Sequence, residues 1–256
     1  MSSNEVTPLA QQPLNLRCLA LTGVFETSVP PPGCFGCVTG DFDGQGISYS
    51  ALQWNFGQAT LQPLLIEMNT SHPDVMGPVF GDLYGELTRV FAMSRTRQVE
   101  WSRSIQSVKH TLDDRWRGCF HALGETAQFQ AIAARHAASL FDGALSLCRT
   151  YGLTSQRAAA LMFDIKVQNG SISPSAHSLI ERDFSALAPG DADVIEAAKM
   201  RAVANRVADS ASVRWREDIR ARKLAVANGT GTVHGLHYDL AVQYGVTLAP
   251  WSGGTD

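Results

Sequence analysis

Apolar residues recur at helical spacing along most of this chain. In the first such segment, helical spacing places five apolar residues on one face: Leu14, Cys18, Leu21, Val24 and Phe25. This helix is predicted to stop by Ser28, because the three prolines at 30–32 cannot continue it. Glu26 is therefore predicted to lie in the last turn of a helix, beside a loop.

Glycines dominate the next segment, 33–57, with the β-favouring residues Ile47, Tyr49 and Trp54 between them. This pattern predicts turns and one or two short strands. Thr60 has the chemistry of a helix N-cap, ahead of a helical apolar pattern at 61–68. The sequence therefore predicts a small β-rich lobe near 34–58, directly after the first helix.

Beyond His72 almost every segment has the helical period. The predicted helices span 74–93, 97–110, 112–123, 125–150, 154–169, 174–187, 191–225 and 232–245, with 229–232 as a loop between helices. The predicted fold class is α+β and predominantly helical. Its parts are a disordered segment at 1–12, a single domain at 13–250 and a C-terminal tail at 251–256.

The composition is that of a folded globular protein. Of the 256 residues, 45% are hydrophobic and 18% are charged, unlike a disordered chain. The net charge of −3 argues against nucleic acid as a partner. The segment 199–223 is nevertheless rich in Lys and Arg, which fits either a solvated helical face or a surface for an anionic polymer.

No segment has the pattern of a secretory signal, and no apolar run reaches the ~18 residues that a membrane span requires. We therefore expect a protein that is made in the cytoplasm and spans no membrane. Any action outside the cytoplasm then depends on a separate delivery route.

Five cysteines are present, so at least one has no disulfide partner within the chain. Cys34 and Cys37 form a C-x-x-C in a loop, which fits a small disulfide, half of a zinc site or two unrelated thiols. His234 and His237 are predicted one helical turn apart, but no nearby Glu or Cys completes a metal motif. We expect no metal and no cofactor.

A glutamate at a helix end, followed by an aspartate in a glycine-rich segment, suits glycosidic bond cleavage. One carboxylic acid protonates the leaving oxygen, while a second carboxylate activates water or stabilises charge at the sugar carbon. Glu26 is the predicted acid and Asp43 its partner, with Asp41 as the alternative on the same strand face. Structural roles also fit, since Glu26 can cap a backbone group and Asp43 can hold an Asp-Gly turn.

The string Phe25-Glu26-Thr27-Ser28, followed by Gly40-Asp41-Phe42-Asp43-Gly44-Gln45-Gly46-Ile47-Ser48, resembles the family 46 chitosanases of the lysozyme-like superfamily. That family has an acid glutamate at a helix end and then an Asp-Gly-x-Gly-x-Thr/Ser segment. The resemblance implies a lysozyme-like fold, with Glu26 as the acid, Asp43 as the base and Ser48 as the hydroxyl that helps to hold the water. The segment 163–170 resembles that family's buried central helix.

The segment 46–58 departs from the chitosanases, in which this strand is shorter and apolar. Its pattern Ser-x-x-Ala-Leu-Gln-Trp-Asn-x-Gly-Gln is more similar to lysozyme-like domains of phage lysins and bacterial cell-wall effectors. That likeness implies a muramidase acting on peptidoglycan glycan strands, reached by release or by injection. The substrate-binding candidates are Asp41, Gln53, Trp54, Asn55, Gln58, Gln168 and Asn169.

Structural roles compete here too, since Trp54 suits a core and the Gln and Asn amides can bond backbone alone. An injected effector implies two further partners, a secretion-machine carrier and an immunity protein. Two rival functions stay open. A chitosanase or chitinase on the same fold is favoured by nine acidic against four basic side chains in residues 1–100, which suit a polycationic substrate. A cell-wall-binding domain without activity is the other.

Overall fold

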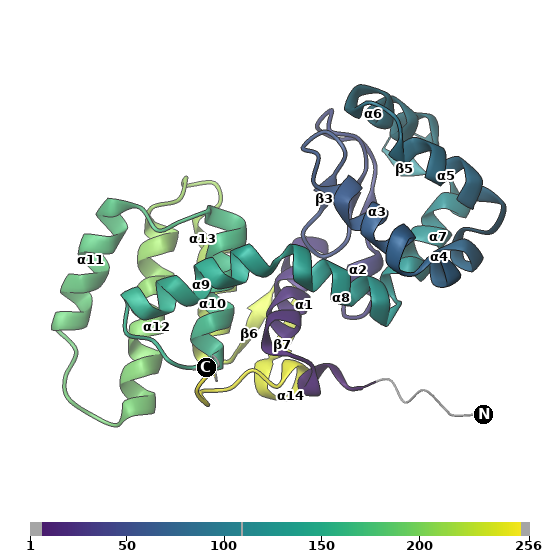
Figure 1. The fold of residues 1–256 in the computed structure, drawn as a ribbon. Helices are drawn as coiled ribbons and strands as arrows, with labels where there is room; N and C mark the ends of the chain where they lie inside the picture. Colours follow the sequence, from purple (N-terminus) through teal and green to yellow (C-terminus); the bar gives the residue numbers. More distant parts are fainter. Residues whose placement is uncertain (1–6, 109, 252–256) are drawn as a thin grey trace. The chain divides into compact units, whose positions relative to one another are not determined.

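The computed structural model describes residues 7–108 and 110–251 (Figure 1). The chain divides into two compact units, each with its own packing. We call residues 22–137 the β-lobe unit, and residues 1–21 together with 138–256 the helical unit. The first long helix, α1 (Leu14–Thr27), contributes residues to both. The single domain expected at 13–250 stays a prediction.

The β-lobe unit begins with the last turns of α1, which ends at Thr27 as predicted. Short elements follow in the glycine-rich segment: α2 (Gly33–Gly36), β1 (Val38–Thr39), β2 (Ser48–Tyr49) and β3 (Trp54–Asn55). The rest of the unit comprises α3 (Leu61–Ser71), α4 (Pro73–Phe80), η2 (Gly81–Leu83), α5 (Tyr84–Phe91), α6 (Arg95–Ser104), β4 (Gln106–Val108), β5 (Thr111–Leu112), α7 (Asp114–Gly124) and α8 (Ala127–His136). The predicted β lobe therefore exists, but it has three short strands where one or two were expected.

The three strands form an antiparallel sheet in the order β1-β2-β3. Tyr49 pairs with Val38 on one side and Trp54 on the other. Paired residues of antiparallel strands share a face of the sheet. Tyr49 is fully buried, and its hydroxyl donates to the Phe120 carbonyl of α7 at 2.8 Å. This face of the sheet is therefore the one that packs on the core of the unit.

Two helix predictions and one N-cap prediction in this unit need correction. The helix expected at 74–93 is interrupted at Gly81, whose φ of +53° breaks the α-helical path. The helix expected at 97–110 ends at Ser104, and β4 and β5 pair as a hairpin instead. Thr60 precedes α3 but makes no capping bond. Its hydroxyl instead accepts from the Asn55 N–H at 3.0 Å.

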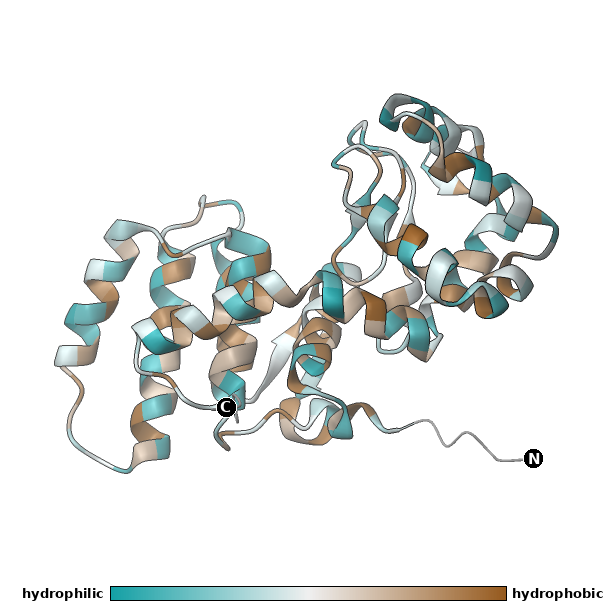
Figure 2. Ribbon diagram, in the orientation of Figure 1, coloured by the Kyte–Doolittle hydropathy of each residue, from teal (hydrophilic) through white to brown (hydrophobic). Residues whose placement is uncertain are grey.

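The helical unit contains longer helices and one hairpin. Its elements, besides the start of α1, are η1 (Leu9–Gln11), α9 (Ala138–Thr150), α10 (Gln156–Asn169), α11 (Pro174–Ser185), α12 (Ala192–Asp209), α13 (Arg216–Asn228), β6 (Thr230–Val233), β7 (Leu236–Asp239) and α14 (Leu240–Tyr244). In Figure 2, α11 and α12 carry alternating hydrophilic and hydrophobic bands, as helices with one buried face do. The central element is α10, which packs against α9, α12 and α13.

Five predictions that involve this unit need correction. The helix expected at 125–150 is divided between α8 and α9 at Ala137, and the one expected at 191–225 is interrupted between Asp209 and Arg216. The helix expected at 232–245 is wrong over 232–239, where β6 and β7 pair in register. The string 229–232, expected as a loop, mostly belongs to β6. Within the disordered segment expected at 1–12, η1 is formed, and residues 1–6 lie outside the described residues.

A buried ionic cluster lies inside the helical unit. Asp164 of α10 is fully buried, and it accepts hydrogen bonds from the Arg222 guanidinium at 2.6 and 2.9 Å. Lys223, also buried, forms an ion pair with the same carboxylate. The Lys223 ammonium donates further to Gln168 Oε1 at 2.7 Å. Two cations of the basic segment 199–223 thus neutralise an internal carboxylate and are not available to an external polymer.

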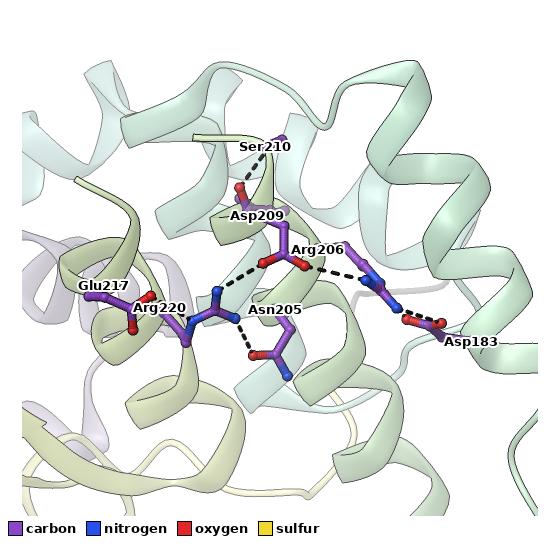
Figure 3. A network of polar contacts seen from close by, with 8 residues as sticks. Asp183, Asn205, Arg206, Asp209, Ser210, Glu217 and Arg220 are labelled. Carbon is purple, nitrogen blue, oxygen red and sulfur yellow. Dashed lines mark hydrogen bonds and ion pairs between the residues drawn. The ribbon is translucent and has the colours of Figure 1, made fainter. Parts of the chain in front are cut away.

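A second, more exposed network joins three helices of the same unit (Figure 3). Arg206 of α12 binds both carboxylate oxygens of Asp183 in α11, at 2.6 and 3.0 Å. Asp209, three residues further along α12, accepts from Arg220 of α13 at 2.8 Å. These contacts use two more cations of the basic segment to align α11, α12 and α13.

None of the five cysteines forms a disulfide, so Cys34 and Cys37 are separate thiols. Burial, together with the neighbouring Cys37, raises the pKa of the Cys34 thiol to about 12. Because the thiolate is the reactive form, Cys34 is kept in its unreactive state. Within the part of the chain that the structure describes, no helix is long and apolar enough to cross a membrane.

Candidate functional site

Glu26 lies one residue before the end of α1, on its exposed side. The two preceding residues, Val24 and Phe25, are buried in the core and hold this end of the helix in place. The Thr27 hydroxyl donates to the Gly23 carbonyl at 2.7 Å, and Ser28 leaves the helix with a φ of +58°. The sequence-predicted acid is therefore solvent-accessible at a helix end that its neighbours fix.

A close contact places this helix end against the β sheet. A Cβ atom on Gly23 would lie only 2.7 Å from Ala51 Cβ, in the turn that connects β2 with β3. Real Cβ atoms do not approach so closely, so a glycine is required here. Since Glu26 follows Gly23 by three residues, its position is tied directly to the β lobe.

Asp43 lies in the glycine-rich loop that leads into β2, and it is exposed. Its Oδ1 accepts a hydrogen bond from the Gln45 N–H at 3.1 Å. Gly44 and Gly46 adopt φ values of +84° and +82°, which other residues rarely tolerate. The predicted turn-forming role of Asp43 is thus present. The hydrogen bond from Gln45 occupies one carboxylate oxygen of Asp43. The side chain still faces the solvent, as a catalytic base requires.

Asp41 has very different surroundings. Its Oδ1 accepts from the Gly46 N–H at 3.0 Å, its Oδ2 pairs with Arg103 of α6, and its side chain is only 9% exposed. Burial alone would raise the pKa of Asp41, but the hydrogen bonds from Arg103 and Gly46 outweigh this effect and lower it. Asp41 is therefore an anion that holds the loop, and Arg103 is a site residue that the sequence analysis missed.

Ser48 lies on the sheet face opposite Tyr49. It pairs with Thr39 of β1 and with Asn55 of β3, so these three polar side chains share that face. Ser48 is half-buried, whereas Asn55 is buried. The role of Ser48 in holding a water molecule stays a prediction, and its half-buried position is compatible with it.

The proposed sugar-binding amides of the β lobe make internal hydrogen bonds. Gln53 donates to the Ser50 carbonyl at 2.8 Å and accepts from the Thr39 hydroxyl at 3.2 Å. Asn55 Oδ1 accepts from the Gln58 N–H at 2.8 Å. These bonds shape the lobe. The side chains of Gln58, which is exposed, and Trp54, which is half-buried, are more accessible to a ligand.

Gln168 and Asn169 lie at the C-terminal end of α10, in the helical unit. Gln168 Oε1 is engaged by Lys223 in the buried ionic cluster. Asn169 Oδ1 is buried and has no hydrogen-bond partner among the described residues. A role of either residue in binding sugar stays a prediction.

An exposed aromatic pair adjoins the loop and was not singled out from the sequence. Phe42, between Asp41 and Asp43, is 69% exposed, and its ring stacks on His110 with centroids 4.4 Å apart. The sequence does contain a signal for this exposed ring, because Phe42 lies between two acidic residues in a loop where burial is not expected. Such a ring offers a flat surface for the apolar face of a sugar.

The structure also bears on the metal hypotheses. His234 and His237 lie in the β6–β7 hairpin, not on a helix, and His234 Nε2 contacts Asp218 at 2.7 Å. Over residues 7–108 and 110–251, no group of three or more His, Cys, Asp and Glu side chains is placed to hold a metal ion.

The chain is similar to known proteins in its structure. No family model matches the chain, and no curated protein matches it in sequence. Among solved structures, a chitosanase from Bacillus subtilis MY002 matches with a TM-score of 0.50 and 17% identity, covering 86% of this chain and 89% of that one. A family 46 chitosanase from Gynuella sunshinyii, solved with chitotetraose, matches with a TM-score of 0.50 and 12% identity, covering 92% and 99%.

The fold is lysozyme-like. This result confirms the predicted fold class, an α+β protein dominated by helices with a small β lobe after the first helix. It also agrees with the resemblance of the segments 25–28 and 40–48 to family 46 chitosanases. At such low identity the likeness is one of fold, so residue roles depend on the geometry described above.

Proposed function

We propose that this protein hydrolyses the β-1,4 bonds of an amino-sugar polymer, with Glu26 as general acid and Asp43 as its partner. One observation carries the proposal. In a lysozyme-like fold, two exposed carboxylates belong to the β-lobe unit, Glu26 at a helix end and Asp43 in a glycine-rich loop. Glycosidic hydrolysis needs such a pair, one to protonate the leaving oxygen and one to direct the attack.

The contacts of Asp41 and Asp43 support different roles for the two residues. Asp41 has both oxygens engaged by the protein, so it positions the loop and does not receive a proton from water. Asp43 keeps an exposed carboxylate, which accepts that proton as the water attacks. Ser48 follows on β2 and serves as the second contact of the water.

The substrate that we favour is peptidoglycan, and the proposed protein is a muramidase. The support is the string 48–58, which resembles the lysozyme-like domains of lysins and cell-wall effectors. The second candidate is chitosan, because the neighbours of known structure are chitosanases. A wall-binding domain without activity is the non-enzymatic alternative.

One experiment separates these candidates. The purified protein is run in gels cast with peptidoglycan or with chitosan, and the products of the cleared polymer are analysed by mass spectrometry. We expect clearing of peptidoglycan and products with reducing N-acetylmuramic ends. Anhydro ends would identify a lytic transglycosylase, clearing of chitosan alone would identify a chitosanase, and no clearing with retained binding would identify a wall-binding domain.

Delivery belongs to the same proposal. A muramidase acts at the cell wall or in the periplasm, so we propose that the protein reaches its substrate by release as a phage lysin or by injection as an antibacterial effector. In the second case a secretion-machine carrier and an immunity protein would be its partners. Co-expression with the neighbouring gene product, followed by pull-down, tests for an immunity protein.

A further inference from the structure

A surface hollow opens beside Asp43, between the glycine-rich loop and α6. Its volume is about 290 Å³, and its loop side is formed by Gly44 and Gln45, the two residues that follow Asp43. Its other side is one face of α6, with Arg95, Val99 and Arg103 at helical spacing. All of these residues belong to the β-lobe unit, so the hollow and the proposed base share one packed body.

The loop side of the hollow is held firmly. The Gly57 N–H donates to the Gln45 carbonyl at 2.8 Å, and Arg103 donates to the Gly44 carbonyl at 3.2 Å. A Cβ atom on Gly46 would lie 2.5 Å from Ser102 Oγ, so the loop lies directly on α6. The hollow is therefore built into the packing of loop and helix.

The lining of the hollow holds more basic than acidic side chains. Its charged residues are two arginines, Arg95 and Arg103, and one acid, Glu100. Arg103 is partly committed to Asp41 and the loop, although its side chain remains 52% exposed. Arg95 is exposed, and among the described residues no hydrogen bond or ion pair engages its guanidinium.

These features distinguish between the two amino-sugar polymers. Each deacetylated unit of chitosan carries an ammonium group, which two guanidinium groups repel. The muramyl unit of peptidoglycan instead carries a lactyl substituent, whose carboxyl group is either free or extended by a stem peptide with its own carboxylates. A guanidinium binds a carboxylate through paired, charge-assisted hydrogen bonds.

We propose that this hollow is a binding subsite for the carboxylate of a muramyl substituent, with Arg95 as its principal ligand and Arg103 as a second positive charge. The inference rests on the proposed function and specifies its substrate, an acidic glycan. The subsite would hold the substituted sugar next to Asp43 and would select against a cationic polymer.

The test measures binding to the Glu26→Gln variant, in which hydrolysis is expected to be too slow to consume the ligands during a titration. Three tetrasaccharides are titrated calorimetrically: alternating N-acetylglucosamine and N-acetylmuramic acid with free lactyl groups, the same chain with stem peptides, and uncharged tetra-N-acetylchitotetraose. Arg95→Gln is compared with Arg97→Gln, a matched change on the same helix outside the hollow. The two muramyl ligands distinguish a lactyl carboxylate from a peptide carboxylate.

Arg95→Gln is expected to weaken binding of at least one muramyl ligand about tenfold, the loss of one charge-assisted contact. Binding of the uncharged chain should not change, and Arg97→Gln should behave as the parent. An equal loss for charged and uncharged ligands, or no loss at all, would overturn the subsite. Failure of the proposed function would show separately, as intact peptidoglycan after treatment with the unmodified protein.

Discussion

Two aspartates that are two residues apart in the loop have opposite surroundings. Asp41 is held by Gly46 and Arg103, while Asp43 is exposed with one oxygen bonded to Gln45. A structural anion needs saturated contacts, whereas a catalytic base needs an open position for water. The contacts of the two side chains therefore indicate different roles, and substitutions can separate them.

Glu26→Gln is expected to reduce hydrolysis by about 10²–10⁴-fold, because an amide cannot protonate the leaving oxygen. The side chain is exposed, so thermal unfolding should stay at the parent temperature. Reducing-end release from peptidoglycan and circular dichroism give the two readouts. Glu125→Gln, an exposed change at the end of α7, is the matched control and should retain full activity.

Asp43→Asn and Asp41→Asn are expected to fail in different ways. Asp43→Asn should lose activity with little change in stability. Asp41→Asn should lose about 1 kcal/mol of unfolding free energy, since the half-exposed Arg103 limits the value of the ion pair, and a smaller part of the activity. Urea unfolding and kcat/KM on one substrate provide the comparison. A larger activity loss at Asp41 than at Asp43 would exchange their roles.

An inverting mechanism is the third expectation at this scale. Glu26 lies on α1 and Asp43 on a loop beyond α2, so the pair belongs to separate elements. Inverting enzymes separate their carboxyl groups by ~6.5–9.5 Å to admit a water, and retaining enzymes by ~5–5.5 Å. NMR of the first product from a β-linked oligomer should show the α-anomer. Initial β-anomer would establish retention and exclude this mechanism.

At the scale of the elements, close approaches of glycines determine how the β-lobe unit is packed. The contact between α2 and α7 is one example. A Cβ atom on Gly124 would lie 2.3 Å from the Gly36 backbone, so the two helices meet without side chains between them. Phe35 and Cys34 of α2 are buried by this approach, which anchors the start of the β lobe.

Two glycines of α7 offer a matched test of this packing. Gly124→Ala should destabilise the protein by about 1–3 kcal/mol, because the added methyl group overpacks a backbone contact. Gly118→Ala has no heavy atom within 4 Å of the new Cβ. It should stabilise the protein by roughly 0.5–1 kcal/mol through helix propensity. Similar effects of both changes on denaturant unfolding would contradict the importance of the contact.

At the scale of the whole molecule, the helical unit depends on a charge cluster in its interior. Burial alone would raise the pKa of Asp164, but the charges and hydrogen bonds of Arg222 and Lys223 outweigh it and lower the pKa. A carboxyl group with a lowered pKa contributes stability above its unfolded pKa of about 3.9. That contribution is lost as the pH falls below this value towards the folded pKa.

Asp164→Asn should therefore cost about 3–5 kcal/mol at neutral pH, because it removes the buried carboxylate that both Arg222 and Lys223 contact. The loss should shrink as the pH falls below about 4, because Asp164 of the unfolded parent then takes up a proton and the advantage of the folded carboxylate declines. Unfolding measured between pH 2.5 and 7 checks both statements. Asp183→Asn, in the exposed network of Figure 3, is the control and should cost much less at every pH. Equal costs would argue that burial does not govern these ion pairs.

The sequence by itself determined the backbone elements that carry Glu26 and Asp43. The prolines after residue 29 end α1 beside Glu26, and the glycines at 44 and 46 permit a turn that no other residue adopts easily. The buried segment of α10 was also predictable, because its apolar residues and its lysozyme-like resemblance coincide. These features depend on neighbouring residues, whose chemistry is legible in the chain itself.

Tertiary structure alone decided the rest. Asp41 meets Arg103, and Asp164 meets Arg222, across separations of 62 and 58 residues. The hairpins of β4–β5 and β6–β7 replaced predicted helices, since cross-strand pairing and burial outweigh local helical periodicity in short segments. The sequence alone therefore indicated which carboxylates and glycines to examine, while long-range packing decided which aspartate is held by the protein and which faces the solvent.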